Sequence, residues 1–415
     1  MTDQRQWYAG IDWASQSHHV FFSDGDGRRI GERAFDHGGE GLAEMVAWLL
    51  AKSGAQEAAQ ILTAIEVPHG PVVETLLERG FRVYAINPKQ VDRFRDRFSP
   101  AGAKDDSRDA AVMASGLRTD PRCFRDLAAT DPVIIELREW SRISDDLGTE
   151  RNRLTNRLRE QLWRYLPAFL ELVDDDLGAE WLLELWEAAP TPAKAARLHA
   201  ATVAKLLKRH RIRRFDAAQV LAVLRKPPIQ VAAGTTEAAR AHIVTLIARI
   251  RLPNRQLKQA HHQLDALTAR LVPAEESEPG QHKQNDVEIL ASLPGVGRIV
   301  LATLLTEACD ALQRRDYAAL RSLTGVAPVT KRSGKSCIIV RRYACHGRLA
   351  NAIYHWARVA TQRDPRSRAK YTTLRSRGHS HARALRSVAD RLVNVACAML
   401  KTGTVFDPSI TGQTA

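Results

Sequence analysis

Residues 7–35 read WYAGIDWASQSHHVFFSDGDGRRIGERAF and decide how the chain begins to fold. Three runs rich in β-branched and aromatic residues, at 7–13, 18–23 and 28–35, each predict a strand. Between the second and third runs, Asp24-Gly25-Asp26-Gly27 has the composition of a hairpin turn. We therefore expect three consecutive antiparallel strands at the start of the chain.

Beyond residue 35, helix and strand patterns alternate along the chain. The expected elements are a helix at about 40–52, a buried strand at 61–65, a helix at 71–79, a strand at 81–86, and helices at 88–97 and 106–117. Three antiparallel strands followed by alternating helices and strands are the order of a ribonuclease H-like fold. The N-terminal third is therefore predicted to be an α/β domain of this type.

Four carboxylates stand at special places in these elements. Asp12 lies in the first strand run, and Glu66 closes the apolar run 61–65, so both are expected at strand ends. Asp106 and Asp109 open a helix, where spacing i, i+3 puts them on one face. A single acid is usually a solvated surface charge, but acids gathered together repel one another unless a cation lies between them. Mg²⁺ binds carboxylate and phosphate oxygens, so the four acids predict a site that cuts phosphodiesters.

The charge of the chain is unevenly distributed. The 415 residues carry a net charge of +14, and residues 286–415 hold 21 of the 61 Lys and Arg but only 8 of the 47 Asp and Glu. Almost the entire excess lies in the last third, which predicts a polyanionic partner, most plausibly nucleic acid, with salt-dependent binding. The length suffices for two or three domains.

Cysteine usage and hydropathy indicate in which cellular compartment the protein is expected. The five cysteines are scattered and form no CxxC pair, which indicates a reducing compartment and argues against a zinc site. The chain starts without a signal peptide, and no apolar run approaches eighteen residues, so we expect no membrane insertion and a cytoplasmic location in a bacterium.

The middle of the chain, 133–285, is predicted to be helical. Apolar residues from Ile243 to Leu271 hold heptad positions over four heptads, with Pro253 where one of them should be. A helical hairpin within the monomer and an intermolecular coiled coil explain this pattern equally well. Residues 272–285 have the composition of a linker.

Two motifs in the basic third predict contact with phosphates. In the first, Leu293-Pro294-Gly295-Val296-Gly297-Arg298 joins two apolar helical stretches, as in a helix-hairpin-helix element whose glycines let a phosphate approach a helix N-terminus. In the second, Lys331, Arg332 and Lys335 surround Ser333. Three interpretations of this second motif are open: a phosphate-binding loop, the site of a nucleophilic serine, or an ordinary basic surface loop. Arg341, Arg342 and later arginines among tyrosines predict a strand-binding surface up to residue 391.

Together these motifs resemble the DEDD transposases of bacterial insertion sequences, the IS110 family, which includes the Piv DNA invertase. The resemblance covers nearly the whole chain and rests on the order and spacing of six segments. These are Gly10-Ile11-Asp12, Glu66, Asn87-Pro88, the tract 104–110, the 293–297 segment and the 325–334 segment.

The resemblance implies a domain plan and a chemistry. It implies a domain similar to the Holliday-junction resolvase RuvC at 1–132, a helical coiled-coil insert with linker at 133–285, a mainly helical transposase domain at 286–402 and a tail at 403–415. In the family an acidic tetrad binds Mg²⁺, a serine attacks DNA, and a bridge RNA pairs with donor and target DNA. Carried over, the tetrad is Asp12, Glu66, Asp106 and Asp109, and the nucleophile is Ser333.

The sequence departs from the family pattern at two positions. The third acid usually follows Lys-Thr, whereas here Lys104 precedes Asp105 and Asp106, so Asp105 is an alternative ligand. Ser336 is an alternative nucleophile to Ser333, but only Ser333 matches the family's Ser-Gly pair.

We therefore expect a Mg²⁺-dependent DNA transposase or site-specific recombinase that acts as a dimer or tetramer, guided by a bridge RNA. The alternatives are a structure-selective nuclease or junction resolvase that uses the tetrad alone, and a nucleic-acid-binding protein without catalysis.

Overall fold

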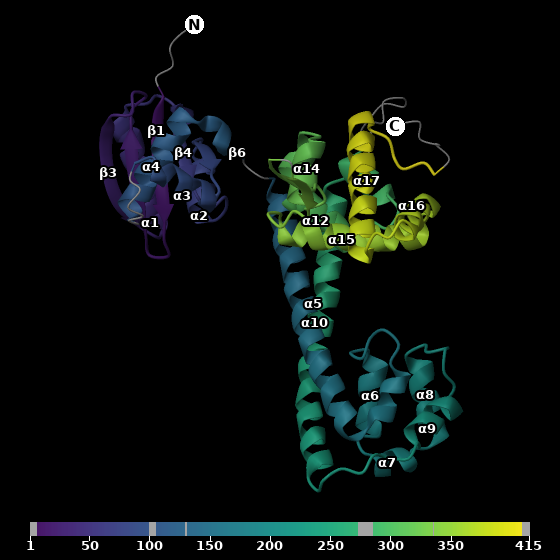
Figure 1. Cartoon of the computed structure of the whole chain (residues 1–415). Coiled ribbons are helices and arrows are strands. Elements are labelled where there is room, and N and C mark those ends of the chain that lie inside the picture. The colour runs from purple at the N-terminus through teal and green to yellow at the C-terminus, as the bar shows by residue number, and fades with distance from the viewer. Residues whose placement is uncertain (1–5, 99–104, 129–130, 273–284, 335, 409–415) are drawn as a thin grey trace. The chain divides into compact units, whose positions relative to one another are not determined.

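The computed structural model describes residues 6–98, 105–128, 131–272, 285–334 and 336–408. The chain divides into two compact units, Met1–Asp131 and Pro132–Ala415 (Figure 1). Each unit has hydrophobic cores of its own.

The first unit is built on a six-stranded mixed sheet. Its strands are β1 Trp7–Trp13, β2 Ser17–Ser23, β3 Arg29–Asp36, β4 Ile61–Ile65, β5 Arg82–Ala85 and β6 Arg125–Leu127, in the order β3-β2-β1-β4-β5-β6. The pairs β1–β2 and β2–β3 are antiparallel, β1–β4 and β4–β5 are parallel, and β5–β6 is antiparallel. The prediction missed only the short strand β6, whose three residues include Arg125 and Asp126 and show no apolar alternation.

Helices cover both faces of this sheet. They are α1 Gly39–Ser53, α2 Pro71–Glu78, α3 Pro88–Asp96 and α4 Asp106–Thr119, with short 3-10 turns η1 Ala58–Gln60 and η2 Pro121–Cys123. Helix α4 packs directly on β1 at Gly10, where a Cβ atom would lie 1.9 Å from the carbonyl oxygen of Ala110. Glycine at this position therefore lets the start of α4 approach the sheet closely, and the α/β prediction for this part of the chain is confirmed.

The second unit contains two long helices, α5 Pro132–Tyr165 and α10 Thr235–Arg270, that lie side by side (Figure 1). The start of α5 and the end of α10 share one core through Leu137 and Leu264. The end of α5 and the start of α10 share another through Leu158 and Ile243, so the two helices are antiparallel. Most of the apolar heptad residues of α10 thus pack within the chain, and Pro253 is buried inside a continuous helix.

Smaller elements complete the second unit. Between α5 and α10 the chain forms η3 Pro167–Leu172, α6 Glu180–Ala188, α7 Pro192–Ala196, α8 Ala200–Arg209 and α9 Ala217–Leu224. After α10 follow α11 Asp286–Ser292, α12 Arg298–Glu307, α13 Cys309–Gln313, α14 Tyr317–Leu323, β7 Val329–Ser333, β8 Ser336–Val340, α15 Gly347–Arg363, α16 Pro365–Ser376 and α17 His381–Thr402. The C-terminal part is therefore helical, as predicted, with one β hairpin.

Trp356 of α15 lies at the centre of the C-terminal core and is 1% exposed. Its indole Nε1 donates to the carbonyl oxygen of Pro294, 3.0 Å away, which ties the α11–α12 turn to α15. Most of the predicted linker, and the end of the tail beyond residue 408, lie outside the described residues. None of the described helices is both long and apolar enough to cross a bilayer.

Candidate functional site

Two of the four predicted acids lie next to each other at one edge of the sheet. Strands β1 and β4 are parallel, and Ile11 pairs with Ile65 in their register. The next residue on each strand is an acid, Asp12 on one and Glu66 on the other, and both are partly buried. Because paired strands lie about 4.8 Å apart, the fold brings these two carboxylates to adjacent positions.

The other two acids lie in the first turn of α4, above the same face of the sheet. Asp106 is exposed, whereas Asp109 is 5% exposed. The Asp109 carboxylate accepts two hydrogen bonds from Arg95 of α3, from Nε at 2.6 Å and from Nη2 at 2.9 Å. These hydrogen bonds raise the pKa of the Arg95 guanidinium. Asp109 is thus already paired with a cation that belongs to the protein.

The arrangement fits a divalent cation only in part. The donor set of carboxylate oxygens suits Mg²⁺, and Asp12 and Glu66 are adjacent. Over residues 6–98, 105–128 and the other described ranges, however, no three His, Cys, Asp or Glu side chains are gathered closely enough to hold a metal ion. The guanidinium of Arg95 lies where Asp109 would otherwise offer its oxygens.

A polar network that was not predicted from the sequence lies beside the acids. His19 of β2 pairs with Asp12 across the antiparallel register. The Nε2 atom of His19 lies 2.6 Å from Oε1 of Glu32 on β3, and Ser107 of α4 donates a hydrogen bond to the same carboxylate. Burial by itself would raise the pKa of Glu32, but the hydrogen bonds from Ser107 and His19 and the charge of Arg29 lower it. Paired residues of an antiparallel hairpin lie on the same face of the sheet, so His19 is expected on the face that carries Asp12. The two predicted strands therefore contained a signal for the position of His19.

The predicted nucleophile lies at the tip of the β7–β8 hairpin. Ser333 and Ser336 pair with each other in its register, and both are exposed. Lys331 and Arg332 are exposed as well, and Lys335 lies outside the described residues. The two serines occupy equivalent positions on the two strands, so position alone does not distinguish them.

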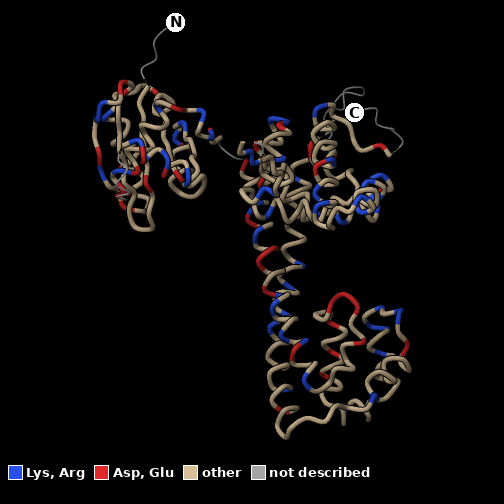
Figure 2. Tube along the Cα trace, in the orientation of Figure 1, with Lys and Arg blue, Asp and Glu red and all other residues tan. Residues whose placement is uncertain are grey.

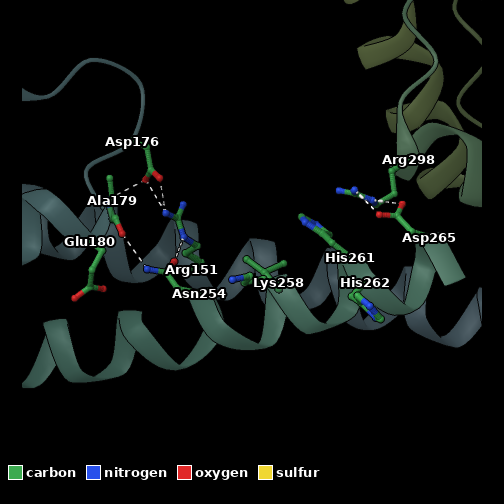
Figure 3. Close-up of a pocket in the computed structure, with 12 residues that line it drawn as sticks. Arg151, Asp176, Ala179, Glu180, Asn254, Lys258, His261, His262, Asp265 and Arg298 are labelled. Atoms are coloured by element: carbon green, nitrogen blue, oxygen red, sulfur yellow. Dashed lines mark hydrogen bonds and ion pairs between the residues drawn. The ribbon is translucent and has the colours of Figure 1, made fainter. Parts of the chain in front are cut away.

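As predicted, two helices flank the Pro294–Gly297 turn, since α11 ends at Ser292 and α12 begins at Arg298. Gly295 has φ +85°, and a Cβ there would lie 2.8 Å from the backbone nitrogen of Ala360, whereas Gly297 faces open space. The predicted phosphate ligand Arg298 donates to both carboxylate oxygens of Asp265 on α10, at 2.5 and 2.6 Å (Figure 3). These hydrogen bonds lower the pKa of Asp265. The Arg298 side chain is therefore engaged within the protein.

A shallow cavity of about 670 Å³ extends from Arg298 along α10 (Figure 3). Its lining mixes cations and anions that pair with each other, such as Arg151 with Asp176 at 2.6 Å. Such a surface has no single charge to offer to a ligand. By contrast, Figure 2 shows Lys and Arg concentrated on α16, whose twelve residues include Arg366, Arg368, Lys370 and Arg375 and no carboxylate.

Comparison with known proteins identifies the class. A family model described as transposase matches residues 9–167, which include the acids of the first unit. A second model, described as the transposase IS116/IS110/IS902 family, matches residues 287–372, which include the α11–α12 turn and the β7–β8 hairpin. Both models describe transposases, and together they match parts of the first unit and of the basic C-terminal part.

Individual relatives agree with this class. The chain is 77% identical over 217 residues to a putative transposase, y4uE, of Sinorhizobium fredii, a match covering 52% of this chain but only 60% of that protein. It is 32% identical over 410 residues to the mini-circle putative transposase for IS117 of Streptomyces coelicolor, a match covering 96% of this chain and 95% of that protein. An uncharacterized 42 kDa protein of insertion element IS900 from Mycobacterium paratuberculosis is 27% identical over 428 residues, covering 98% of this chain and 99% of that protein. The chain belongs to the IS116/IS110/IS902 transposase family.

Proposed function

We propose that this chain cuts and rejoins the DNA of an insertion sequence, using acids of the first unit and a serine of the second. The observation that carries the proposal is the parallel register of β1 and β4, which makes Asp12 and Glu66 neighbours. Two carboxylates at the ends of adjacent parallel strands, beneath a helix that brings two more, suit phosphodiester chemistry with a bound cation.

The proposal includes a ribonuclease H-like, RuvC-like identity for the first unit. Three antiparallel strands, two further parallel strands and a helix with acids in its first turn support it. Asp12, Glu66 and Asp106 would hold Mg²⁺, and Asp109 would join them once Arg95 releases it. When bound, the ion would polarise the phosphate and stabilise the charge that develops on it.

Ser333 is the proposed nucleophile. Its Oγ would form an ester bond to phosphorus while a deoxyribose oxygen leaves, and the exposed hairpin tip allows a DNA strand to approach it. Neither strand of the hairpin carries a carboxylate or an imidazole, so the serine proton passes to a base from another segment. The cations Lys331, Arg332 and Lys335 would offset the charge of the attacked phosphate.

The proposed partners are donor and target DNA, a bridge RNA and further copies of the chain, in the bacterial cytoplasm. The basic excess of residues 286–415 supports a nucleic-acid load. Protein purified together with its own element should then retain one discrete RNA. Recovery of only random cellular fragments would contradict RNA guidance.

The decisive experiment incubates full-length protein with a supercoiled plasmid that carries the element ends, with Mg²⁺ or with EDTA. The wild type should recombine the plasmid and leave a covalent protein–DNA adduct only with Mg²⁺. Asp12→Ala and Glu66→Ala should abolish recombination.

Variants of the two serines test the nucleophile with a matched pair. Ser333→Ala should retain DNA binding within a few-fold and form no adduct, whereas Ser336→Ala should still form it. An adduct on Ser336 would overturn the assignment, and cutting without any adduct would identify a hydrolytic nuclease or resolvase.

A further inference from the structure

A second cavity lies at the base of the β7–β8 hairpin and has no role in the proposed chemistry. Its volume is about 140 Å³, and residues of α15, α17 and the segments flanking the hairpin line it. Part of the lining is apolar and includes Val326, Ile353, Leu385 and Ala389. Three guanidinium groups, those of Arg341, Arg342 and Arg386, lie in the same lining.

The three arginines of the cavity have no counter-ion among the described residues. Some other arginines of this unit do pair with carboxylates, as Arg321 does with Asp390 at 2.7 Å. Within the part of the chain that the structure describes, Arg341, Arg342 and Arg386 form no ion pair, and no Asp or Glu lines the cavity. Three like charges without a counter-ion are unfavourable unless an anion joins them.

The pKa of Arg386 and the hydrogen bonding of Arg342 are both consistent with a missing anion. Burial, followed by the charges of Arg341 and Arg383, lowers the pKa of Arg386. The Nε atom of Arg342 is buried and has no hydrogen-bond partner among the described residues. Buried polar atoms are nearly always satisfied, so Arg342 retains a donor for an acceptor that the chain itself does not supply.

Aromatic side chains stand at the same place. Tyr354 lines the cavity and is 40% exposed. Tyr343 is 80% exposed, and the guanidinium of Arg341 lies 5.2 Å from the centroid of its ring. Exposed aromatic rings beside arginines provide surfaces on which the bases of single strands stack.

We propose that this cavity receives one unstacked nucleobase of the nucleic-acid strand, whose flanking phosphates bind Arg341, Arg342 and Arg386. A lining that combines apolar side chains with three guanidinium groups matches a flat ring attached to phosphates. The cavity is smaller than the roughly 300 Å³ of typical small-molecule sites, so it holds a ring rather than a whole cofactor. The inference rests on the proposed action on nucleic acid and adds a base-holding site to it.

The cavity lies a short distance along the hairpin from its tip. Val340, just before Arg341, pairs with Val329, and Ser333 lies four residues further along β7. At about 3.3 Å per residue this is about 13 Å. A strand anchored by one base in the cavity would thus be held only a short distance from the hairpin tip.

The test uses full-length protein and a single-stranded DNA oligonucleotide in which thymine is replaced by 5-iodouracil. Irradiation should cross-link the strand to Tyr354 or to a neighbouring residue of the cavity, as located by mass spectrometry. Ala382→Phe should abolish this cross-link, because residue 382 lines the cavity at an exposed position and the new ring would fill it without changing any charge.

Three further measurements separate binding of the base from binding of the phosphates. An abasic strand of the same length should bind the wild type and Ala382→Phe equally. Arg386→Gln should make the slope of log K against log salt concentration shallower by about 0.7, the value for one lost phosphate contact on a single strand. Arg377→Gln, which removes the same charge at an exposed position outside the cavity, should keep the cross-link at Tyr354.

An unchanged cross-link in Ala382→Phe, or cross-links only outside the cavity lining, would overturn the base site while leaving the proposed function intact. Failure of the wild type to bind any strand would instead overturn both.

Discussion

At the scale of single residues, the acids of the first unit fall into two groups with different physical demands. Asp12, Glu66 and Asp106 are exposed or partly exposed. Asp109 is buried, and a buried carboxylate needs a partner. Arg95 supplies that partner with two hydrogen bonds, so Asp109 contributes to stability as well as to any chemistry.

Replacement of Asp109 should therefore unfold the first unit more easily. Asp109→Ala leaves the largely buried guanidinium of Arg95 without its main partner, and breaking such a pair costs about 3–5 kcal/mol. Asp106→Ala, at an exposed position of the same helix turn, should change the free energy of unfolding by less than about 0.5 kcal/mol. Urea unfolding followed by circular dichroism measures both, and equal effects would contradict a structural role for Asp109.

His18 should make the stability of the first unit depend on pH. Its side chain is fully buried, with Nε2 3.0 Å from Nδ1 of His37, and burial followed by the charge of His37 lowers its pKa below 6.5. The unfolded chain then binds the proton more tightly than the folded one. The stabilising contribution is therefore complete above about pH 6.5 and is lost as the pH falls through the folded-state pKa.

Unfolding free energies at pH 7.5 and pH 5.5 test this expectation. His18→Gln should reduce the difference between the two values, whereas His69→Gln, at an exposed position, should preserve it. A difference that is the same in all three proteins would assign the pH dependence to other groups.

At the scale of elements, the two glycines of the α11–α12 turn have different roles, although the sequence motif does not distinguish them. Gly295 has a left-handed backbone and lies against α15, whereas Gly297 has φ −107° and no atom within 4 Å of an added Cβ. Only Gly295 is therefore required for the turn itself, and Gly297 leaves room next to the N-terminus of α12.

Gly295→Ala should lower the melting temperature, because a left-handed alanine costs about 1–2 kcal/mol and its Cβ would also collide with the backbone of α15. Gly297→Ala should leave the melting temperature unchanged within error. Calorimetry of the two variants is the measurement, and a larger loss from Gly297→Ala would show that the turn is built differently.

The α5–α10 pair is the second feature at this scale. The heptad pattern of α10 was compatible with a hairpin within the monomer and with a coiled coil between chains. In the structure, most of its apolar residues pack in cores of the same chain, which α5 and the C-terminal helices also form. The oligomeric state remains a proposal, and the in-chain packing makes Leu264 a core residue with no exposed surface.

Leu264→Ala should accordingly cost about 2–5 kcal/mol of unfolding free energy through the cavity that it leaves. Leu252→Ala is the matched control on the same helix, because Leu252 is 49% exposed. Light scattering on both variants tests the alternative, since a change from oligomer to monomer in folded Leu264→Ala would show that this residue also packs between chains.

At the scale of the whole molecule, the chain consists of two compact units, each with hydrophobic cores of its own. Residues between Trp7 and Leu127 form the cores of the first unit, and residues between Val133 and Phe406 form those of the second. Each unit should therefore unfold as a cooperative block of its own.

Differential scanning calorimetry of the full chain should resolve two transitions. Asp109→Ala should lower only one of them, and Leu264→Ala only the other, because each variant perturbs the core or ion pair of a single unit. A single transition that both variants shift together would show that the two units are thermodynamically coupled.

The sequence by itself determined the elements and their order. Five of the six strands of the first unit, its four helices and the helical character of the C-terminal part follow from apolar periodicity and turn residues, which act between near neighbours in the chain. The location of the basic excess is a matter of composition alone. Motif order was sufficient to indicate the family that the comparisons established.

Only the tertiary structure decided which side chains meet. The pairing of Arg95 with Asp109, the contact of His19 with Glu32 and the pairing of Ser333 with Ser336 depend on strand register and on where helices cross the sheet. The packing of α10 on α5 and the arginine-lined cavity depend on contacts between segments far apart in the chain. A local pattern can specify the face on which a side chain lies, but its partner is set by long-range packing, since a register shift of one residue would move each side chain to the opposite face.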